Sequence, residues 1–440
     1  MKRWRKFFKW VPIGVAVVVA AFVHGFLTHR HQIFPYGAVK KLVNWSTWHR
    51  QFPDRSWQAA RGAAETDTAN LPYAAGYRPP PPREGVTLHE AGAAPGVNLY
   101  HSGHDTAAIL MDMEGRELFR WKLGAIQPWM AHAPAANTEF VFPEWGYWRR
   151  VKPLPDGGLL AIYENAGLVK LDRTGKVDWA FWGGCHHDLH LSDAGEIFVI
   201  ARHPRVVRRF HPDRPVWDDE IVVLNRRGQV LRRVSILDCF TNSPFEPMLD
   251  QHPGDHDLFH TNTVIAFEEG EGRGIPFFGP GTVLVSIRNL NALAVLDMER
   301  ATVVWAVTGQ WRRQHEPVPM ANGRLLLFNN QFRRDRSQIL EIDPLTRAVT
   351  WEYHQEDGGF YSRILGSCQV LPNGSVLITE SEGGRAFEIT REKRMVWEFL
   401  NPHRAGEKGE LIATLFEMRR FPADYFDSEF RQIWTGHVRD

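Results

Sequence analysis

The stretch Cys185–Val199 reads CHHDLHLSDAGEIFV. It starts with polar residues, His186–Asp188, which we call its polar head, and continues with an apolar run, a tight turn and a second apolar run. This order decides the fold. The turn lies around Asp193 and Gly195. Similar hairpins carry the turn sequences PDGG from Pro155, ANGR from Ala321 and PNGS from Pro372. Asp-Gly and Asn-Gly between apolar runs predict β-hairpins, because both turn residues are expected to take positive φ. We therefore expect a repeat whose polar heads occupy matching positions.

A second sequence pattern recurs after these hairpins: a predicted strand that mostly ends in Asp, then a turn, then a predicted strand that contains Trp. It occurs at 111–121, 171–179, 296–305, 342–351 and 388–397. Units of four short strands, repeated every 40 to 50 residues or roughly so, are typical of an all-β protein with a β-propeller fold. The number of repeated units favours six blades, and five or seven blades stay possible if one unit is miscounted. Leu411–Phe421 is expected to close the ring, and the Trp residues are expected to pack rather than to form a ligand cage.

Composition excludes several classes of protein. A chain of 440 residues with 43% hydrophobic residues argues against disorder, and 52 basic against 51 acidic residues argue against a nucleic-acid-binding protein. No run of amphipathic helices supports a parallel βαβ fold. Cys185, Cys239 and Cys368 allow at most one disulfide, with the pairing open.

The N-terminus predicts a membrane anchor. Five basic residues precede an apolar run, Val11–Leu27, which is close to the lower limit of about 17 residues for a membrane-spanning helix. The basic side is expected to stay in the cytoplasm and the remainder to cross. A signal peptide cleaved after Ala21 is the alternative, and Trp4 and Trp10 favour the uncleaved anchor.

Four segments follow from this organisation. Residues 1–28 are predicted to be a transmembrane signal-anchor, and residues 29–94 a juxtamembrane helix and a proline-rich linker. Residues 95–425 are predicted to form the propeller catalytic domain, with an aromatic-rich insertion over 127–150. Residues 426–440 are predicted to be a C-terminal tail.

Three heads of the repeat carry histidine: His187, His260 and His315. Arg288 lies at the end of a second strand. The first strand of each propeller blade lines the central channel, so the heads of different blades are expected to converge. A single histidine among 20 is more often structural, but three at equivalent heads indicate a functional site. The choice between His186 and His187 stays open.

Two chemistries suit these residues. A catalytic zinc ion bound by three histidines is one, with Asp188, Asp257 and Glu316 available to orient the ligands. The arginine favours the other, because a fixed cation disfavours a dication beside it. In a metal-free anion pocket, a neutral imidazole is a nucleophile, and the cations bind the oxygens of a transferring sulfuryl or phosphoryl group.

The ordered heads HHDL from His186, DLFHTNT from Asp257, SIRN from Ser286 and QHE from Gln314 resemble those of the bacterial arylsulfate sulfotransferases over roughly residues 150 to 400. The resemblance implies an extracytoplasmic six-bladed propeller that moves a sulfuryl group from a phenolic sulfate ester to a phenol through a sulfohistidine. It implies no nucleotide donor and no other cofactor.

The resemblance also implies roles for individual residues. His315 would be the nucleophile, His260 and Arg288 would bind the sulfuryl oxygens, and His187 would act as acid and base at the phenol oxygen. The anchor and the position of Arg288 depart from the family pattern and indicate a divergent, membrane-anchored branch.

The expected partners are a small aryl sulfate donor, a phenolic acceptor and, through the N-terminal helix, a membrane; no nucleic acid is expected. The expected location is the bacterial inner membrane, single-pass, with the bulk of the chain on the periplasmic side. Two alternatives stay open: a non-catalytic, membrane-tethered binding propeller, and a metal-dependent hydrolase at the channel mouth.

Overall fold

The structure is a computed structural model that describes residues 78–123, 147–211, 215–251, 256–271, 274–333, 335–356, 359–406 and 408–437. All of these belong to one compact unit, Leu71–Asp440. The predicted anchor (1–28) and the helix and linker up to residue 77 lie outside the described residues, as does most of the predicted insertion. Within the described ranges, no helix has the length and apolar character needed to cross a membrane.

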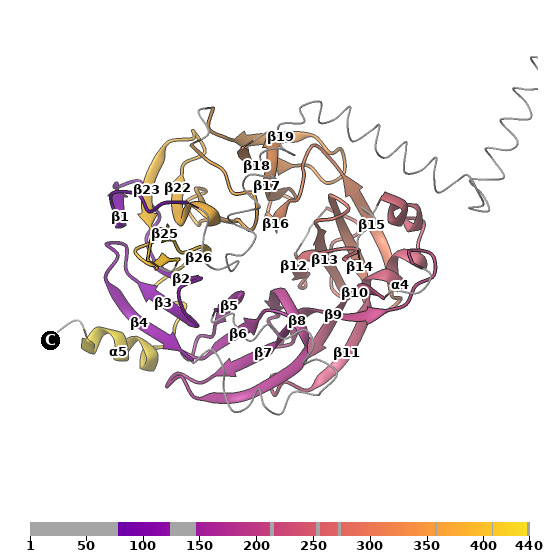
Figure 1. The fold of residues 1–440 in the computed structure, drawn as a ribbon, viewed down its shortest axis with the longest axis horizontal. Coiled ribbons are helices and arrows are strands. Elements are labelled where there is room, and N and C mark those ends of the chain that lie inside the picture. Colours follow the sequence, from indigo (N-terminus) through magenta and orange to yellow (C-terminus); the bar gives the residue numbers. More distant parts are fainter. Residues whose placement is uncertain are drawn as a thin grey trace, which may run out of the picture. The chain divides into compact units, whose positions relative to one another are not determined.

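The described residues fold into antiparallel sheets around a central axis, which is the architecture of a β-propeller (Figure 1). The first sheet has the order β26 (Leu415–Phe421), β2 (Val97–Ser102), β3 (Ala107–Met111), β4 (Glu117–Lys122). The next sheet has seven strands: β5 (Arg150–Pro153), β6 (Leu159–Tyr163), β7 (Ala166–Leu171), β8 (Val177–Leu191), β9 (Ile197–Arg205), β10 (Val216–Leu224) and β11 (Val230–Ser235).

Three further sheets complete the ring. The first contains β12 (Thr261–Ala266), β13 (Thr282–Ile287), β14 (Ala292–Asp297) and β15 (Thr302–Thr308). The second contains β16 (His315–Pro319), β17 (Leu325–Arg333), β18 (Arg336–Ile342) and β19 (Val349–Tyr353). The third contains β20 (Ser367–Val370), β21 (Val376–Glu380), β22 (Arg385–Ile389), β23 (Met395–Leu400) and, at its outer edge, β1 (Gly85–His89). The short elements are α4 (Ile236–Thr241), η4 (Glu246–Gln251), η5 (Ser381–Gly383), β24 (Arg404–Ala405), β25 (Leu411–Ile412) and α5 (Ser428–His437).

The ring is closed by strands from the two ends of the propeller. β26, near the C-terminus, pairs antiparallel with β2, so that Phe421 lies opposite Val97 and Met418 opposite Tyr100. This confirms the prediction that Leu411–Phe421 supplies the closing strand. Such a pairing ties the first sheet to residues more than 300 positions away and makes β26 the innermost strand of that sheet.

The stretch that opened the sequence analysis lies in the middle of the seven-stranded sheet. β8 is 15 residues long and pairs with two neighbours in succession. Its first half pairs with β7, with Trp179 opposite Lys170, and its second half pairs with β9, with Leu189 opposite Val199. The polar head of Cys185–Val199 therefore lies where β8 passes from one set of strands to the next.

The hairpin turns are confirmed, but their backbone differs from the expected one. Only the glycines take positive φ, with values of 84° at Gly157, 83° at Gly195, 79° at Gly323 and 84° at Gly374. The residue before each glycine has negative φ. Each loop is a type I turn followed by one left-handed residue, the glycine, as is usual for a three-residue hairpin loop. The Asp or Asn instead accepts a backbone N–H, as Asp156 does from Gly158 at 2.9 Å.

The recurring Asp and Trp residues have structural roles, as predicted for Trp. Asp112 Oδ1 accepts the backbone N–H groups of Glu114 and Arg116 at 3.1 and 2.8 Å, which stabilises the turn after β3. Trp121 Nε1 donates to the carbonyl of Gly157, in a turn of the next sheet, at 2.8 Å. The indoles of Trp179, Trp351 and Trp397 donate in the same way to Arg226, Arg391 and Met113.

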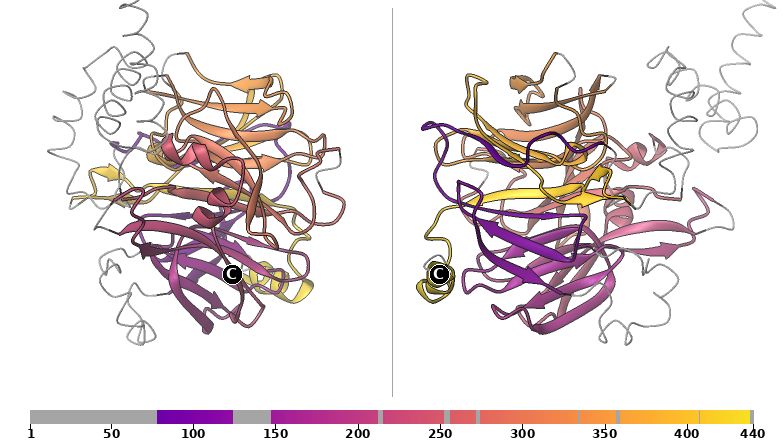
Figure 2. Two further views of the ribbon diagram at one scale, coloured as in Figure 1. Left: turned by 90° about the vertical axis from the view of Figure 1, so that its right-hand side faces the viewer. Right: turned by 60° about the vertical axis from the view of Figure 1, so that its left-hand side comes forward.

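Two elements extend the propeller beyond the boundaries drawn from the sequence. β1 lies within 29–94 and pairs with β23, with Gly85 opposite Leu400. α5 lies within 426–440 and sits outside the ring beside β4 (Figures 1 and 2), where Phe430 packs on Phe119 with ring centroids 4.8 Å apart. These contacts were not predicted, because the linker and the tail lack a regular apolar period.

Candidate functional site

Hydrogen bonds between neighbouring inner strands bring the polar heads together. The N–H of Val264 in β12 donates to Asp188 Oδ2 in β8 at 2.9 Å. The N–H of Glu316 in β16 donates to Thr263 Oγ1 in β12 at 3.1 Å. Side chains of one blade thus satisfy the backbone of the next. The C-terminal part of β8, which holds Asp188, lies beside β12, and β12 lies beside the start of β16.

Two of the predicted histidines are in direct contact. The rings of His187 and His260 have centroids 4.7 Å apart and cross at 72°. Both residues have left-handed backbones, with φ of 57° and 50°. Such a conformation costs on the order of 1–3 kcal/mol per residue, so the surrounding hydrogen bonds must hold it in place. Strained backbone of this kind is concentrated at functional sites.

Hydrogen bonds fix the orientation of the His260 and His315 rings. Asp257 Oδ2 accepts from His260 Nδ1 at 2.5 Å. Asn330 Oδ1 and the carbonyl of Arg313 accept from His315 Nδ1 at 2.7 and 3.0 Å. These oxygens can only accept, so Nδ1 carries the proton and Nε2 carries the lone pair in both neutral rings.

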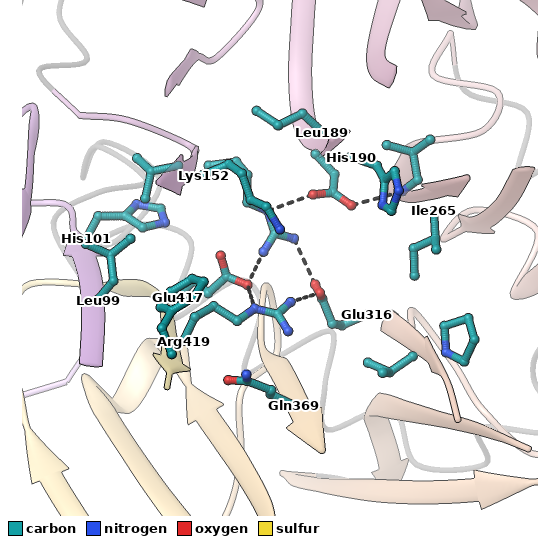
Figure 3. A pocket seen from close by; sticks show the side chains of 17 residues that line it. Leu99, His101, Lys152, Leu189, His190, Ile265, Glu316, Gln369, Glu417 and Arg419 are labelled. Atoms are coloured by element: carbon teal, nitrogen blue, oxygen red, sulfur yellow. Dashed lines mark hydrogen bonds and ion pairs between the residues drawn. The ribbon is translucent and has the colours of Figure 1, made fainter. Parts of the chain in front are cut away.

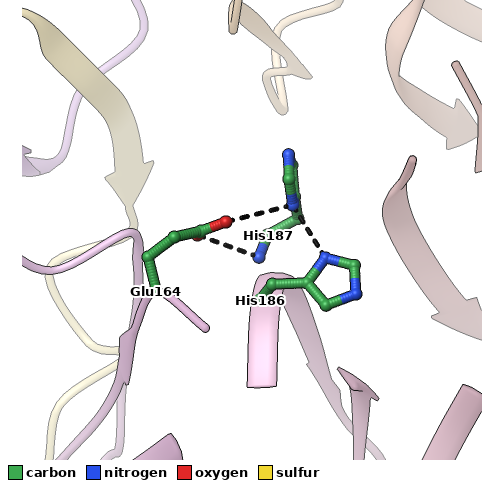
Figure 4. A group of neighbouring side chains, drawn as sticks. All are labelled: Glu164, His186 and His187. Carbon is green, nitrogen blue, oxygen red and sulfur yellow. Dashed lines mark hydrogen bonds and ion pairs between the residues drawn. The ribbon is translucent and has the colours of Figure 1, made fainter. Parts of the chain in front are cut away.

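His187 lies between two groups that contact the same ring nitrogen (Figure 4). Its Nδ1 is 2.8 Å from Nδ1 of His186 and 3.4 Å from Glu164 Oε1. Nε2 is the ring nitrogen left for substrate. The sequence left His186 and His187 as alternatives; the structure gives them different surroundings, because the side chain of His186 is fully buried and its Nε2 lies 3.5 Å from Asp219.

Two guanidinium groups act on these imidazoles. Arg288 is held next to His260, because its N–H donates to the His260 carbonyl at 3.4 Å and its guanidinium donates to Asn289 Oδ1 at 3.0 Å. Its charge lowers the pKa of both His260 and His315. All four residues predicted from the sequence are therefore linked by contact or by charge.

The sequence prediction missed the second guanidinium, that of Arg149. Arg149 is 5% exposed, with Nε 3.6 Å from Glu164 Oε2. Its charge lowers the pKa of His187 and of His315. A signal was available in the sequence, because Arg149, His187 and His315 each lie eight residues before the glycine of their hairpin turn.

The two imidazoles nearest to Arg149 are neutral at pH 7. Burial is the largest cause that lowers the pKa of His187 and of His315 far below 6.5, and the charge of Arg149 adds to it. The hydrogen bond that His315 Nδ1 donates to Asn330 opposes this shift at His315 without reversing it. A neutral imidazole with a free lone pair is a competent nucleophile.

An ion network surrounds Arg150 among the residues that line a cavity (Figure 3). The guanidinium of Arg150 contacts Asp188 Oδ1 at 2.9 Å, Glu316 Oε2 at 2.8 Å, and Glu417. Arg419 binds the same two glutamates, and the group lines a cavity of about 290 Å³. Asp188 and Glu316 were available to orient zinc ligands in the sequence prediction; in the structure both pair with the buried guanidinium of Arg150.

Among the described residues, the group with metal-ligand geometry is Glu164, His186 and His187, whose candidate ligand atoms all lie within 4.8 Å of one another. This is not the set of His187, His260 and His315 that the sequence suggested. The guanidinium of Arg149 beside Glu164 already supplies a counter-charge, and the 2.8 Å between the two Nδ1 atoms is a hydrogen-bond distance. The arrangement fits a hydrogen-bonded pair better than a dication.

The three cysteines are free and buried. Burial raises the pKa of the Cys185 thiol, which adjoins the head, and raises the pKa of Cys239 to about 12. Both are therefore protonated at pH 7 and are poor nucleophiles.

The buried imidazoles predict a loss of stability in mild acid. Burial lowers the pKa of His101 to about 3 and of His190 to about 4, whereas an unfolded histidine titrates near 6.5. Below pH 6.5 the unfolded state binds more protons, so the free energy of unfolding falls by up to about 1.4 kcal/mol per pH unit for each group. We expect the melting temperature to be level from pH 8 to 6.5 and to fall from 6.5 to 5. The slope should be smaller in His101→Gln; a level curve down to pH 5 would contradict the prediction.

The family model described as arylsulfotransferase (ASST) matches residues 155–402, more than half of the chain. A comparison with curated protein sequences gives no match.

Similar solved structures are distant. One is a protein of unknown function from Bacteroides caccae, 12% identical, with a TM-score of 0.48 over 74% of this chain and 98% of that chain. Another is a streptogramin B lyase, 10% identical, with a TM-score of 0.42 over 77% and 97%. A third is the WD40 propeller domain of Doa1, 11% identical, with a TM-score of 0.42 over 73% and 88%. These identities are too low to bear on activity.

Proposed function

The chain belongs to the arylsulfotransferase family, and from this premise we propose that it moves a sulfuryl group from a phenolic sulfate ester to a phenol without a nucleotide donor. The observation that carries the proposal is the orientation of His260 and His315. Each donates Nδ1–H to an oxygen and keeps the Nε2 lone pair for substrate. In addition to burial, the positive charges of Arg149 and Arg288 both lower the pKa of His315.

The reaction proceeds in two half-reactions. In the first, the lone pair of His315 Nε2 forms an N–S bond while the S–O bond to the aryl oxygen breaks, and its electron pair leaves with the phenolate. His187 gives a proton to that oxygen. In the second, His187 takes the proton of the incoming phenol, whose oxygen attacks sulfur, and the N–S electron pair returns to His315.

Charge stabilisation is the main task of the remaining groups. A sulfuryl group in transfer is loosely bonded to both partners and carries negative charge on its three oxygens, as a phosphoryl group does. Arg288 and Arg149 supply cationic N–H groups for these oxygens, and His260 joins them when its Nε2 takes up a proton, which the Asp257 carboxylate favours. Because these groups are held by buried hydrogen bonds and ion pairs, little reorganisation is needed as charge develops.

Trapping the covalent intermediate tests the proposal. Purified protein is mixed with 4-nitrophenyl sulfate in the absence of a phenol acceptor, and its intact mass is measured. We expect one added sulfuryl group per chain, mapped to His315, which disappears when phenol is supplied. Turnover without any such adduct would contradict the sulfohistidine route, and tight ligand binding without turnover would favour the binding-module alternative.

The same proposal includes the wider architecture. The seven-stranded sheet is counted as two blades that share β8, which with the four other large sheets gives six blades. Val11–Leu27 is proposed as an uncleaved anchor that holds the propeller on the periplasmic side of a bacterial inner membrane, as a divergent branch of the family. Protease protection in spheroplasts and in inverted vesicles distinguishes this topology from its reverse.

A further inference from the structure

A line of buried groups leads away from His187. His187 Nδ1 is 2.8 Å from His186 Nδ1, and His186 Nε2 is 3.5 Å from Asp219 Oδ1. His186 and Asp219 are both 0% exposed. The other carboxylate oxygen of Asp219 accepts the N–H of Thr261 at 2.8 Å, which fixes the carboxylate in place.

The middle of this line is an ion pair between two buried atoms, one from His186 and one from Asp219. His186 Nε2 and Asp219 Oδ1 are buried and make no regular hydrogen bond within the described part of the chain. The ion pair between them is the one contact that relieves both, and it is strongest when His186 carries a positive charge. An unpaired buried carboxylate would otherwise cost several kcal/mol.

His187 alone is poorly suited to be the acid of the first half-reaction. Burial and the charges of Arg149 and His260 keep its pKa far below 6.5, so an imidazolium at this position is unfavourable at pH 7. A neutral His187 can still give up the proton on Nε2, provided that another group supplies a proton to Nδ1. His186 is the nearest group that can do so.

Resting on the function proposed above, we propose that Asp219 and His186 form a proton store for His187. Before sulfuryl transfer, His186 is protonated on both nitrogens, with Nε2–H directed at Asp219 and Nδ1–H donated to His187 Nδ1. His187 is then neutral and presents Nε2–H to the aryl oxygen. It is a proton donor without ever becoming an imidazolium.

Both half-reactions balance in this arrangement. As the S–O bond breaks, the Nε2 proton of His187 passes to the phenolate, and the Nδ1 proton of His186 passes to His187 Nδ1. His186 is left neutral with Nε2–H on Asp219, and His187 Nε2 holds a lone pair. The incoming phenol then gives its proton to that Nε2, and the Nδ1 proton returns to His186. No other co-reactant is consumed.

The charges around the pair suit this exchange. Glu164 Oε1, 3.4 Å from His187 Nδ1, receives N–H when His187 holds the proton, and Arg149 offsets its charge when His187 does not. A counter-charge therefore lies within a few ångströms of His187 Nδ1 both when this nitrogen holds the proton and when His186 holds it. The two protonation states are thus kept close in energy. The other charged or titratable groups that act on His187 are His260 and Arg202.

The test is the dependence of turnover on the basicity of the leaving phenol. In His186→Asn we expect turnover of phenyl sulfate to fall by about 10²–10⁴-fold, the usual contribution of a general acid. Turnover of 4-nitrophenyl sulfate should change little, because its weakly basic phenolate departs without a proton. His187→Asn should show the same selective loss, and Asp219→Asn, which keeps an oxygen for the Thr261 N–H, a smaller one.

His190→Asn is the matched control, because His190 lies four residues after His186 in the same strand and its Nε2 is also buried without a hydrogen-bond partner in the described part of the chain. It should leave the ratio of the two donors unchanged. Equal losses with both donors in His186→Asn, or no loss with either, would overturn the proton store. Stoichiometric zinc that is lost in His186→Asn would also overturn it. No transfer by the wild-type protein with either donor would instead reject the proposed function itself.

Discussion

His315→Asn is expected to reduce sulfuryl transfer by about 10⁴–10⁶-fold, which is the range seen when a covalent nucleophile is removed. The asparagine amide nitrogen has no available lone pair, so no N–S bond can form. We expect the variant to fold, because the amide N–H of asparagine can donate to Asn330 Oδ1 and to the Arg313 carbonyl in place of the ring Nδ1–H. Release of 4-nitrophenol and the sulfated adduct should disappear together.

The matched control for this variant is His89→Asn. His89 lies in β1 at the outer edge of a sheet, where its side chain is 35% exposed and contacts only the charge of Glu114 within the described residues. Its activity should equal that of the wild type, and both variants should melt close to the wild type. If His315→Asn retained more than a hundredth of the activity, another group would have to be the nucleophile.

The fold could be predicted from the sequence because its repeats are encoded locally. Each hairpin carries its own turn residues, and each Asp contacts backbone groups two to four positions away, as at Asp112 and Arg116. Apolar alternation then fixes which face of each strand is buried. The type of turn was not predicted, because Asn-Gly and Asp-Gly occur in two kinds of hairpin that differ only in the φ of the residue before glycine.

The candidate site could be predicted only in part. His187, His260 and His315 were found because each is a chemically unusual residue at a repeated position. Arg149 was missed although it stands as far before its hairpin glycine as His187 and His315 do, because arginine is common on protein surfaces; its burial beside Glu164 is visible only in the structure. The ion network of Arg150 and Glu417 was also beyond the sequence, since its members lie 267 residues apart and meet only when the ring closes.

Arg149→Met is the second variant for which we expect a large effect, a fall of about 10²–10³-fold in kcat/KM. This is the usual cost of removing one fixed donor from a site where negative charge develops. Methionine keeps most of the side-chain length, so packing against Phe416, whose ring centroid is 6.0 Å from the guanidinium carbon, is largely retained. Arg149→Lys should be intermediate, because lysine keeps the charge but loses the planar fork of donors.

The pH profile separates an electrostatic role for Arg149 from a structural one. Its charge lowers the pKa of His187 and of His315, so its removal must raise both pKa values. In the wild type we expect activity to persist below pH 6.5, because His315 stays unprotonated there; in Arg149→Met the acid limb should move to higher pH, while Arg149→Lys keeps the wild-type limb. Arg300→Met, at a position 79% exposed on the turn after β14, is the control and should change neither rate nor profile. A slower Arg149→Met enzyme with an unmoved acid limb would mean that the guanidinium only supports the fold, since the loss of a nearby positive charge must otherwise make both imidazoles easier to protonate.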